Sequence, residues 1–224
     1  MTNADFAEPL AEKKKRARRI LAALRKAYPD ADCALNHKSS LELLISTILS
    51  AQSTDETVNK VAPVLFEKYP TAEAIAQAPR EAVEEIVHAT GFFRQKAKNI
   101  QASCARIVEA FGGNVPQTIE ELVSLPGVAR KTANVVLGTF FGISEGIVVD
   151  THVGRIATLL ALTWRSKNGK DAVKIERDLM EVIPQKSWIY LSHALIRHGR
   201  LVCVARKPDC ANCTLARHCP SATV

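Results

Sequence analysis

Apolar residues recur every three to four positions along most of the chain, and glycine and proline interrupt them at short intervals. The stretches 20–24, 41–49 and 58–65 follow the spacing of one helical face. Further helices are expected over 72–78, 81–88, 94–111, 118–124, 130–140, 152–161, 170–182 and 187–199, with breakers between them. Only residues 147–149 resemble a strand, and three residues cannot support a sheet. The pattern therefore predicts an all-α protein of about ten short helices.

Composition places the chain among globular proteins. Its 224 residues are 47% hydrophobic and 24% charged, which is enough apolar material for one large domain or two small ones. No apolar run reaches the roughly 18 residues that a membrane helix requires. The N-terminus is polar and then basic, without the apolar core of a signal peptide. We therefore expect a cytoplasmic protein with no membrane partner.

The positive charge is confined to the two ends of the chain. Residues 1–30 hold 8 basic and 4 acidic side chains, and residues 186–224 hold 6 and 1. The middle, 31–185, holds 16 basic and 18 acidic side chains. This distribution is expected if both ends meet on one surface that faces nucleic acid. For the basic run at 13–19, a solvated helix explains the charge equally well.

The segment Leu125–Lys131 has the residues of a phosphate-binding turn at the start of a helix. A Pro-Gly turn that enters a helix exposes backbone N–H groups, which hold a phosphate without any side chain. At Lys131 the positive end of the helix dipole and the neighbouring Arg130 both disfavour an ammonium, so this lysine is a candidate nucleophile. Asp150, nineteen residues later, is a candidate carboxylate partner. Together these groups indicate chemistry on a sugar of the nucleic-acid backbone.

Four of the six cysteines crowd the last 22 residues, with the spacing Cys203-x6-Cys210-x2-Cys213-x5-Cys219. In a cytoplasmic chain a tight cysteine cluster favours a metal site over disulfides. Both zinc and a [4Fe–4S] cluster accept four thiolates, and the spacing alone leaves both open. The isolated Cys33 and Cys104 are expected to be small buried side chains instead.

These motifs together resemble the endonuclease III family of DNA glycosylases, within the helix-hairpin-helix-Gly/Pro-Asp superfamily. The resemblance rests on the cysteine spacing, on Leu125–Lys131, on Val149–His152 and on Leu49–Asp55, which all occur in family order. It runs from about residue 20 to residue 220.

The resemblance implies a fold of two helical lobes. A six-helix barrel would span 33–143 and contain the helix-hairpin-helix at about 118–140. The second lobe would combine 1–32 with 144–224, and its four cysteines would hold a [4Fe–4S] cluster within 203–219. Damaged double-stranded DNA would lie across the cleft between the lobes, which accounts for the basic charge at both ends of the chain.

The resemblance also implies roles for single residues. Lys131 would be the catalytic nucleophile and Asp150 the catalytic carboxylate. Gln52 matches the residue that fills the gap left by a flipped base, and Phe92 stands where the family has an aliphatic wedge. The other expected DNA contacts are Gly127, Ala129, Arg130, His152, Arg206 and Lys207. Structural roles remain open as well, because Asp150 suits a helix N-cap and one of Phe92 and Phe93 is expected in the core.

One position departs from the family hairpin, which carries a glycine where this chain has Ala129. If the backbone there has a positive φ, alanine is strained by roughly 1 kcal/mol. If a phosphate must approach closely, the methyl group interferes. The sequence therefore predicts that Ala129→Gly tightens binding to damaged duplex DNA.

The function implied is that of a monomeric, nucleoid-associated DNA glycosylase and AP lyase. It would excise oxidised pyrimidines from duplex DNA and nick the abasic site by β-elimination through a Schiff base on Lys131. A mismatch-specific thymine glycosylase of the same superfamily is the alternative enzyme. A non-catalytic DNA-binding or redox-sensing protein is the other alternative, although binding alone does not require both Lys131 and Asp150.

Overall fold

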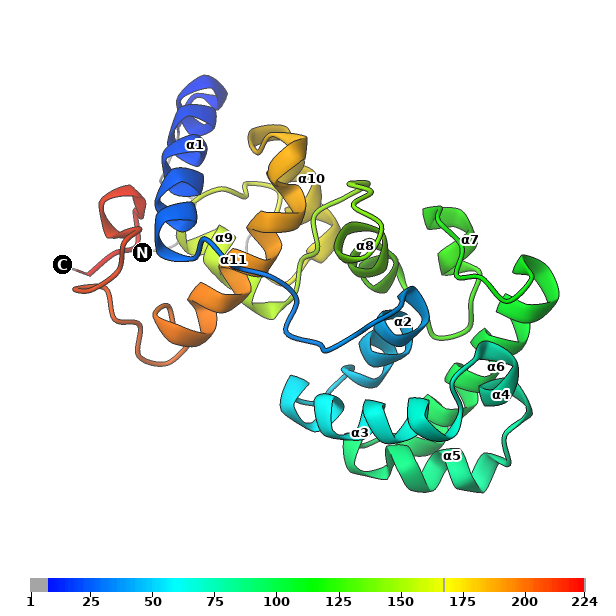
Figure 1. The fold of residues 1–224 in the computed structure, drawn as a ribbon. Helices are drawn as coiled ribbons and strands as arrows, with labels where there is room; N and C mark the ends of the chain where they lie inside the picture. The colour runs from blue at the N-terminus through cyan, green and yellow to red at the C-terminus, as the bar shows by residue number, and fades with distance from the viewer. Residues whose placement is uncertain (1–7, 167, 224) are drawn as a thin grey trace. The chain divides into compact units, whose positions relative to one another are not determined.

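The structure, a computed structural model, describes residues 8–166 and 168–223. Most of these residues lie in helices joined by loops (Figure 1). Within the described residues lie eleven α-helices and three short 3-10 helices, and no strand, which confirms the predicted all-α class. The helices are α1 (Leu10–Ala27), α2 (Ser40–Leu49), α3 (Asp55–Lys68), α4 (Ala72–Gln77), α5 (Arg80–Val87), η2 (His88–Thr90), α6 (Phe93–Phe111), α7 (Ile119–Val123), α8 (Arg130–Thr139), α9 (Thr151–Leu159), α10 (Ala172–Val182), η3 (Gln185–Ser187), α11 (Trp188–Leu201) and η4 (Ala216–His218). In the described part of the chain, none of the helices combines the length and the apolar character needed to cross a membrane.

Side-chain caps begin many of these helices. Ser39, Thr54, Thr71 and Thr118 each accept a hydrogen bond from a backbone N–H in the first turn that follows. At Thr118 the hydroxyl oxygen accepts the N–H of Glu121 at 3.2 Å. These caps satisfy N–H groups that have no partner inside the helix, and they fix where each helix starts.

The chain divides into two compact units. The central unit is the continuous segment Cys33–Glu145, and the terminal unit combines the N-terminal segment through Asp32 with the chain from Gly146 onwards. Helices α2 to α8 therefore belong to the central unit, and α1 and α9 to α11 to the terminal unit.

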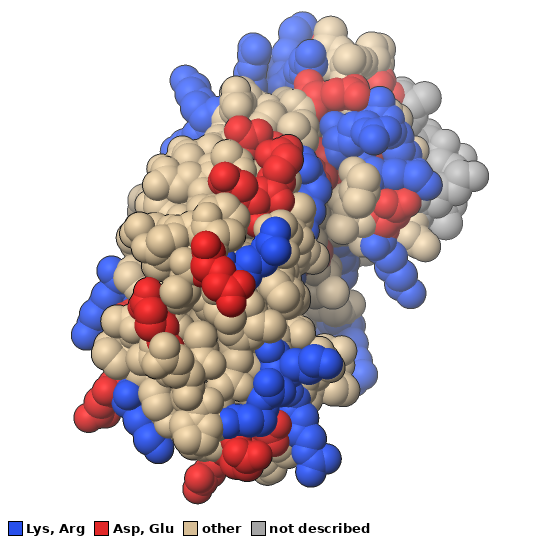
Figure 2. Space-filling model, turned by 90° about the vertical axis from the view of Figure 1, so that its right-hand side faces the viewer, with Lys and Arg blue, Asp and Glu red and all other residues tan. Residues whose placement is uncertain are grey.

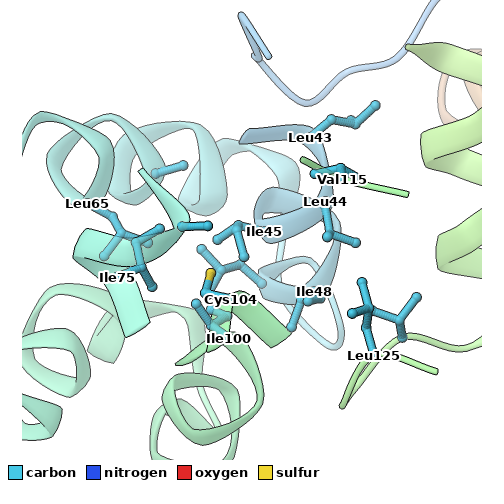
Figure 3. Close-up of a cluster of buried hydrophobic side chains, with 14 of the residues drawn as sticks. Leu43, Leu44, Ile45, Ile48, Leu65, Ile75, Ile100, Cys104, Val115 and Leu125 are labelled. Carbon is cyan, nitrogen blue, oxygen red and sulfur yellow. The ribbon is translucent and has the colours of Figure 1, made fainter. Parts of the chain in front are cut away.

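The core of the central unit is built around α2 (Figure 3). Every residue of this helix from Leu43 to Leu49 is buried, because apolar or small side chains follow one another on all its faces. Its neighbours α3, α6 and α8 contribute apolar side chains such as Leu65, Ile100 and Leu137. Cys104 is fully buried here as expected, and burial raises the pKa of its thiol to about 12. Cys33 is only partly buried against the same core.

The terminal unit has its own core, formed by α1, α9, α10 and α11. Two glycines allow close approach of the backbone in it. A Cβ atom at Gly154 would lie 2.4 Å from the carbonyl oxygen of Gly169, and one at Gly199 would lie 2.7 Å from His152 Nδ1. A larger residue at Gly154 would push away the loop that carries Gly169, and one at Gly199 would push α9 away from α11.

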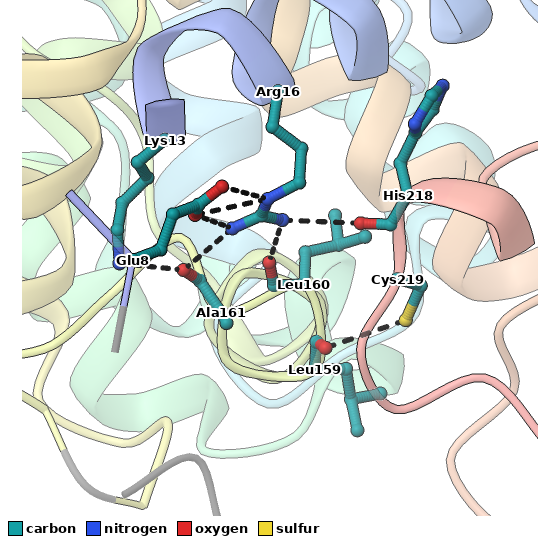
Figure 4. A network of polar contacts seen from close by, with 8 residues as sticks. All are labelled: Glu8, Lys13, Arg16, Leu159, Leu160, Ala161, His218 and Cys219. Carbon is teal, nitrogen blue, oxygen red and sulfur yellow. Dashed lines mark hydrogen bonds and ion pairs between the residues drawn. The ribbon is translucent and has the colours of Figure 1, made fainter. Parts of the chain in front are cut away.

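Two basic residues of α1 are buried in the terminal unit (Figure 4). Lys13 Nζ donates to the carbonyl oxygen of Ala161, and the Arg16 guanidinium donates to those of Leu160 and Ala161. Arg16 also forms an ion pair with Glu8, with 2.7 Å between Nη2 and Oε2. These groups satisfy carbonyls at and just beyond the C-terminus of α9, where intrahelical donors run out. Part of the basic run at 13–19 is therefore structural, while residues 1–7 lie outside the described residues.

Candidate functional site

The hairpin predicted at Leu125–Lys131 connects α7 to α8 in the central unit. Its apolar residues Leu125 and Val128 are buried, and the Val128 N–H donates to the Leu125 carbonyl at 3.1 Å. Gly127 is exposed between them with a φ of +79°, a conformation that favours glycine. The two apolar side chains thus anchor a turn whose tip faces solvent.

Helix α6 supports this hairpin from behind. The Ser103 hydroxyl donates to the carbonyl oxygen of Pro126 at 2.6 Å. A Cβ atom at Gly127 would lie 2.7 to 2.9 Å from atoms of the Asn99 side chain, including its Cβ. Glycine is therefore required at position 127 for two independent reasons, the positive φ and the contact with α6.

Ala129 is the N-cap of α8, and its backbone is extended, with a φ of −93° and a ψ of 167°. The condition under which this alanine would be strained, a positive φ, is not met, because any residue adopts this extended conformation. Unlike the capped helices, α8 has no side chain that accepts from its first-turn N–H groups. Those N–H groups and the helix dipole together suit an anion such as a phosphate.

Arg130 and Lys131 are the first two residues of α8, and both are exposed. The ammonium of Lys131 therefore extends from the positive end of a ten-residue helix. A group in this position is open to a substrate bound at the hairpin.

Asp150 caps α9 in the terminal unit, as the structural interpretation predicted. Its Oδ1 accepts the backbone N–H of Val153 at 2.8 Å, and the side chain is half-buried. Its other carboxylate oxygen has no hydrogen-bond partner among the described residues. One oxygen therefore orients the carboxylate, and the second is available to accept a proton or to stabilise a positive charge.

His152, two residues further on, packs within the terminal unit. Its ring lies against Gly199 of α11, and its buried Nδ1 has no hydrogen-bond partner in the part of the chain that the structure describes. His152 therefore packs between α9 and α11.

Gln52 and Phe92 share an unusual backbone conformation in the central unit. Both are exposed and lie in the left-handed region, with φ values of 54° and 48°. Phe92 is 66% exposed, whereas Phe93 is half-buried against the core. Left-handed conformations in residues other than glycine cost about 1–2 kcal/mol, and they gather at sites of function.

The four clustered cysteines line one cavity of about 60 Å³ in the terminal unit. Arg155 Nη1 donates to Cys203 Sγ at 3.4 Å, and His198 Nε2 lies 3.5 Å from Cys213 Sγ. Burial raises the pKa of both Cys213 and Cys219. Burial and the charge of Arg155 lower the pKa of His198 to about 4, so its imidazole is neutral at pH 7.

The four cysteines supply four sulfur donors to this cavity, which His198 and Asp209 also line. Four thiolates are a donor set that suits an iron–sulfur cluster. Among the described residues, no three His, Cys, Asp or Glu side chains are grouped so that they could hold a metal ion.

Arg206 and Lys207 are exposed in the loop between Cys203 and Cys210. On the face shown in Figure 2, basic and acidic side chains are interspersed.

Comparison with known proteins places this hairpin in a family. The sequence model for HhH-GPD superfamily base excision DNA repair proteins matches residues 45–185, more than half of the chain, including Lys131 and Asp150. Endonuclease III of Synechocystis sp. is 56% identical over 213 residues, which cover 95% of each chain. The chain belongs to the endonuclease III family. Endonuclease III of Escherichia coli is 39% identical over 200 residues, 89% of this chain and 92% of the relative.

Solved structures agree with membership in the endonuclease III family. A non-covalent endonuclease III–DNA complex has a TM-score of 0.87 at 41% identity, covering 93% of this chain and 96% of that one. A trapped covalent endonuclease III–DNA intermediate has a TM-score of 0.86 at 41% identity, with the same coverage. A thermostable thymine-DNA glycosylase shares the fold alone, at 19% identity and a TM-score of 0.80. This endonuclease III relative is thus a DNA-binding glycosylase and AP lyase of base excision repair.

Proposed function

We propose that this enzyme excises oxidised pyrimidines, such as thymine glycol and dihydrouracil, from damaged duplex DNA and then cleaves the abasic site with Lys131. The observation that carries the proposal is the start of α8, where exposed Lys131 follows a glycine-dependent hairpin and an uncapped helix N-terminus. The covalent intermediate formed by a relative supports a nucleophile in this family. We place the enzyme in the cytoplasm, at the nucleoid, as a monomer.

The first step forms one bond and breaks one. The neutral amine of Lys131 attacks C1′ of the exposed sugar, the bond from C1′ to the damaged base breaks, and the base leaves as its anion and is then protonated. Asp150 accepts the proton released from Lys131, through the oxygen that does not cap α9, and offsets the positive charge that develops on the sugar. The sugar ring then opens as the bond between C1′ and O4′ breaks, O4′ takes the proton held by Asp150, and an iminium joins C1′ to Lys131 Nζ.

The second step cleaves the strand. The iminium acidifies the C2′ hydrogen, so a base removes that proton while the bond between C3′ and its phosphate oxygen breaks. Water then hydrolyses the imine, which releases the unsaturated sugar and regenerates the amine of Lys131. A single lysine thereby supplies both the glycosylase and the lyase activity.

The other site residues bind and deform the DNA in this proposal. The N-terminus of α8, with Gly127, Ala129 and Arg130, holds a backbone phosphate. Gln52 fills the space left by the flipped nucleotide, and Phe92 inserts between neighbouring bases. Arg206 and Lys207 contact phosphates, so each lost contact should lower the salt dependence of binding by about one unit of slope. We also keep His152, two residues after Asp150, as an expected contact with the DNA.

We assign the cysteine cavity to a [4Fe–4S] cluster held by Cys203, Cys210, Cys213 and Cys219. The donor set supports this assignment, because each thiolate binds its own iron and the four sulfurs need not converge on one ion. When bound, the cluster would fix the fold of the loop that carries Arg206 and Lys207. Iron and sulfide analysis with a visible absorbance band supports the cluster, and a colourless zinc protein contradicts it.

Borohydride trapping tests the proposed function directly. The substrates are a duplex with one thymine glycol and a matched duplex with one abasic site. Wild-type protein and Lys98→Ala, which removes an exposed lysine of α6, should form covalent adducts on both, and Lys131→Ala on neither. Adducts on the abasic duplex alone would overturn the assignment to oxidised pyrimidines. Adducts with Lys131→Ala as abundant as those of wild type would remove Lys131 from its role.

A further inference from the structure

Lys96 of α6 is a buried cation that no carboxylate among the described residues neutralises. Its side chain is 5% exposed, and its Nζ donates to two backbone carbonyls, that of Leu49 at 2.8 Å and that of Thr90 at 2.7 Å. No ion pair of Lys96 occurs in the described part of the chain, and burial lowers the pKa of its ammonium. Burying an unpaired ammonium is costly, whereas methionine would fill similar space without that cost.

The two carbonyls stand at the ends of two segments that matter for DNA. Leu49 is the last residue of α2, three positions before Gln52, and Thr90 is the last residue of η2, two positions before Phe92. The backbone N–H of Lys96 also donates to the carbonyl oxygen of Phe92 at 3.0 Å. One residue of α6 therefore bonds to both chain segments that lead into the left-handed residues.

We propose that Lys96 is a positioning residue that holds the Gln52 loop and the Phe92 loop at a fixed spacing, so that both side chains enter the DNA stack together. The inference rests on the proposed function, in which these residues fill and wedge the stack. Gln52 and Phe92 keep their strained left-handed conformations only if contacts around them hold the backbone in place. The Lys96 ammonium supplies two of these contacts, one to each segment. Because the ammonium contacts two separate segments, its loss would free the two loops to move independently.

The chain provides a matched control on the same helix. Gln101 is also buried, at 7% exposure, and its Nε2 donates to two backbone carbonyls, those of Ile75 and Ala78. Those carbonyls lie at the end of α4, and no hydrogen bond links Gln101 to the Gln52 or Phe92 loop in the described structure. Lys96→Met and Gln101→Met both remove two buried hydrogen bonds to backbone carbonyls, and Gln101→Met also removes the bond that Oε1 accepts from Arg80 Nε. Only Lys96→Met releases the two loops.

The test compares two substrates for each variant under single-turnover conditions. A duplex with one thymine glycol requires a nucleotide to be forced out of the stack, whereas a single-stranded oligonucleotide with an abasic site does not. The quantity measured is the ratio of the duplex cleavage rate to the single-strand borohydride-trapping rate. We expect Lys96→Met to lower this ratio about tenfold or more, which is the size of one lost base-stacking contact. Gln101→Met should leave the ratio within about twofold of wild type, even if both variants melt at lower temperature.

The outcomes separate the inference from the proposed function. An unchanged ratio for Lys96→Met, or the same fall for both variants, overturns the positioning role. A wild-type protein that forms no adduct on the single-stranded abasic oligonucleotide overturns the Lys131 chemistry instead. If Lys96→Met does not fold, Lys96→Gln takes its place with the same control and the same criteria, because its amide is too short to span both carbonyls.

Discussion

Arg16 donates a hydrogen bond from its guanidinium to the carbonyl oxygen of His218 at 3.2 Å, and 202 positions separate the two residues in sequence. His218 directly precedes Cys219, whose sulfur lies 3.5 Å from the carbonyl oxygen of Leu159. Arg16 also bonds to Leu160, the next residue of that segment. A side chain of the first helix therefore braces the segment that holds the fourth proposed cluster ligand.

We expect Arg16→Met to destabilise the protein by about 2–4 kcal/mol, because it leaves buried carbonyls and the Glu8 carboxylate without their donor. Lys15→Met is the control, since Lys15 pairs with Glu12 on the exposed face of the same helix and should change stability by less than about 0.5 kcal/mol. Urea unfolding measures both. Equal midpoints for the two variants would contradict the brace.

Gly127→Ala should cost about 2–4 kcal/mol of stability and weaken binding to damaged duplex. The added methyl group is strained at a φ of +79° and overlaps the Asn99 side chain. Gly112→Ala, in the left-handed region at a φ of +58° and a ψ of 34° with nothing near its Cβ, should cost only the backbone strain of about 1 kcal/mol. Urea unfolding and duplex titration are the measurements. A loss no larger than that of Gly112→Ala would show that the hairpin tolerates a side chain against α6.

Phe92→Gly should separate stability from activity. Relief of left-handed strain, about 1–2 kcal/mol, offsets the added chain entropy of glycine, so the free energy of unfolding should change by less than about 1 kcal/mol. Excision from duplex DNA should fall about tenfold or more, because a base-stacking contact is lost. Phe92→Leu should retain activity as an aliphatic wedge. Thermal melting and single-turnover excision check this, and unchanged excision by Phe92→Gly would exclude the wedge.

His193 of α11 should make the protein less stable in mild acid. Burial lowers its pKa below the ordinary value of 6.5, although the charge of Asp32 opposes this. As the pH falls below about 6.5, the imidazole takes up a proton in the unfolded chain but not yet in the folded protein. The free energy of unfolding therefore decreases until the pH reaches the lower pKa of the folded state. His193→Gln should lose less stability than wild type between about pH 7 and pH 5. Melting temperatures across that range measure it, and parallel curves would contradict it.

Local signals in the sequence were sufficient for much of the fold. Apolar spacing and the glycine and proline breakers located the helices, and Thr118 and Asp150 begin helices as their side chains predict. The hairpin was also predictable from the sequence, because a Pro-Gly dipeptide before a helix is typical of a tight turn. The sequence left the φ of Ala129 open, because that angle depends on where α8 begins rather than on the residue types nearby.

The buried cations could not be predicted from sequence. Lys13, Arg16 and Lys96 occur in stretches with other basic residues, and their types suggest a solvated surface. Each donates to backbone carbonyls, which leave no mark in the residue types, and only Arg16 also pairs with a carboxylate, that of Glu8. For Lys13 and Arg16 those carbonyls lie more than 140 positions away. Only the tertiary structure reveals that these side chains cap helix ends.

The terminal unit is built from both ends of the chain, and this affects how the protein is made. The central unit is continuous, so a ribosome delivers all of it before α9 emerges. Helix α1 leaves the ribosome first, yet the His218 carbonyl that Arg16 binds follows 202 residues later. At about 5–20 residues per second, roughly 10–40 s pass before Arg16 can form this hydrogen bond. The apolar face of α1 packs on α10 and α11, so newly made chains are exposed to misassembly through α1 until those helices have followed.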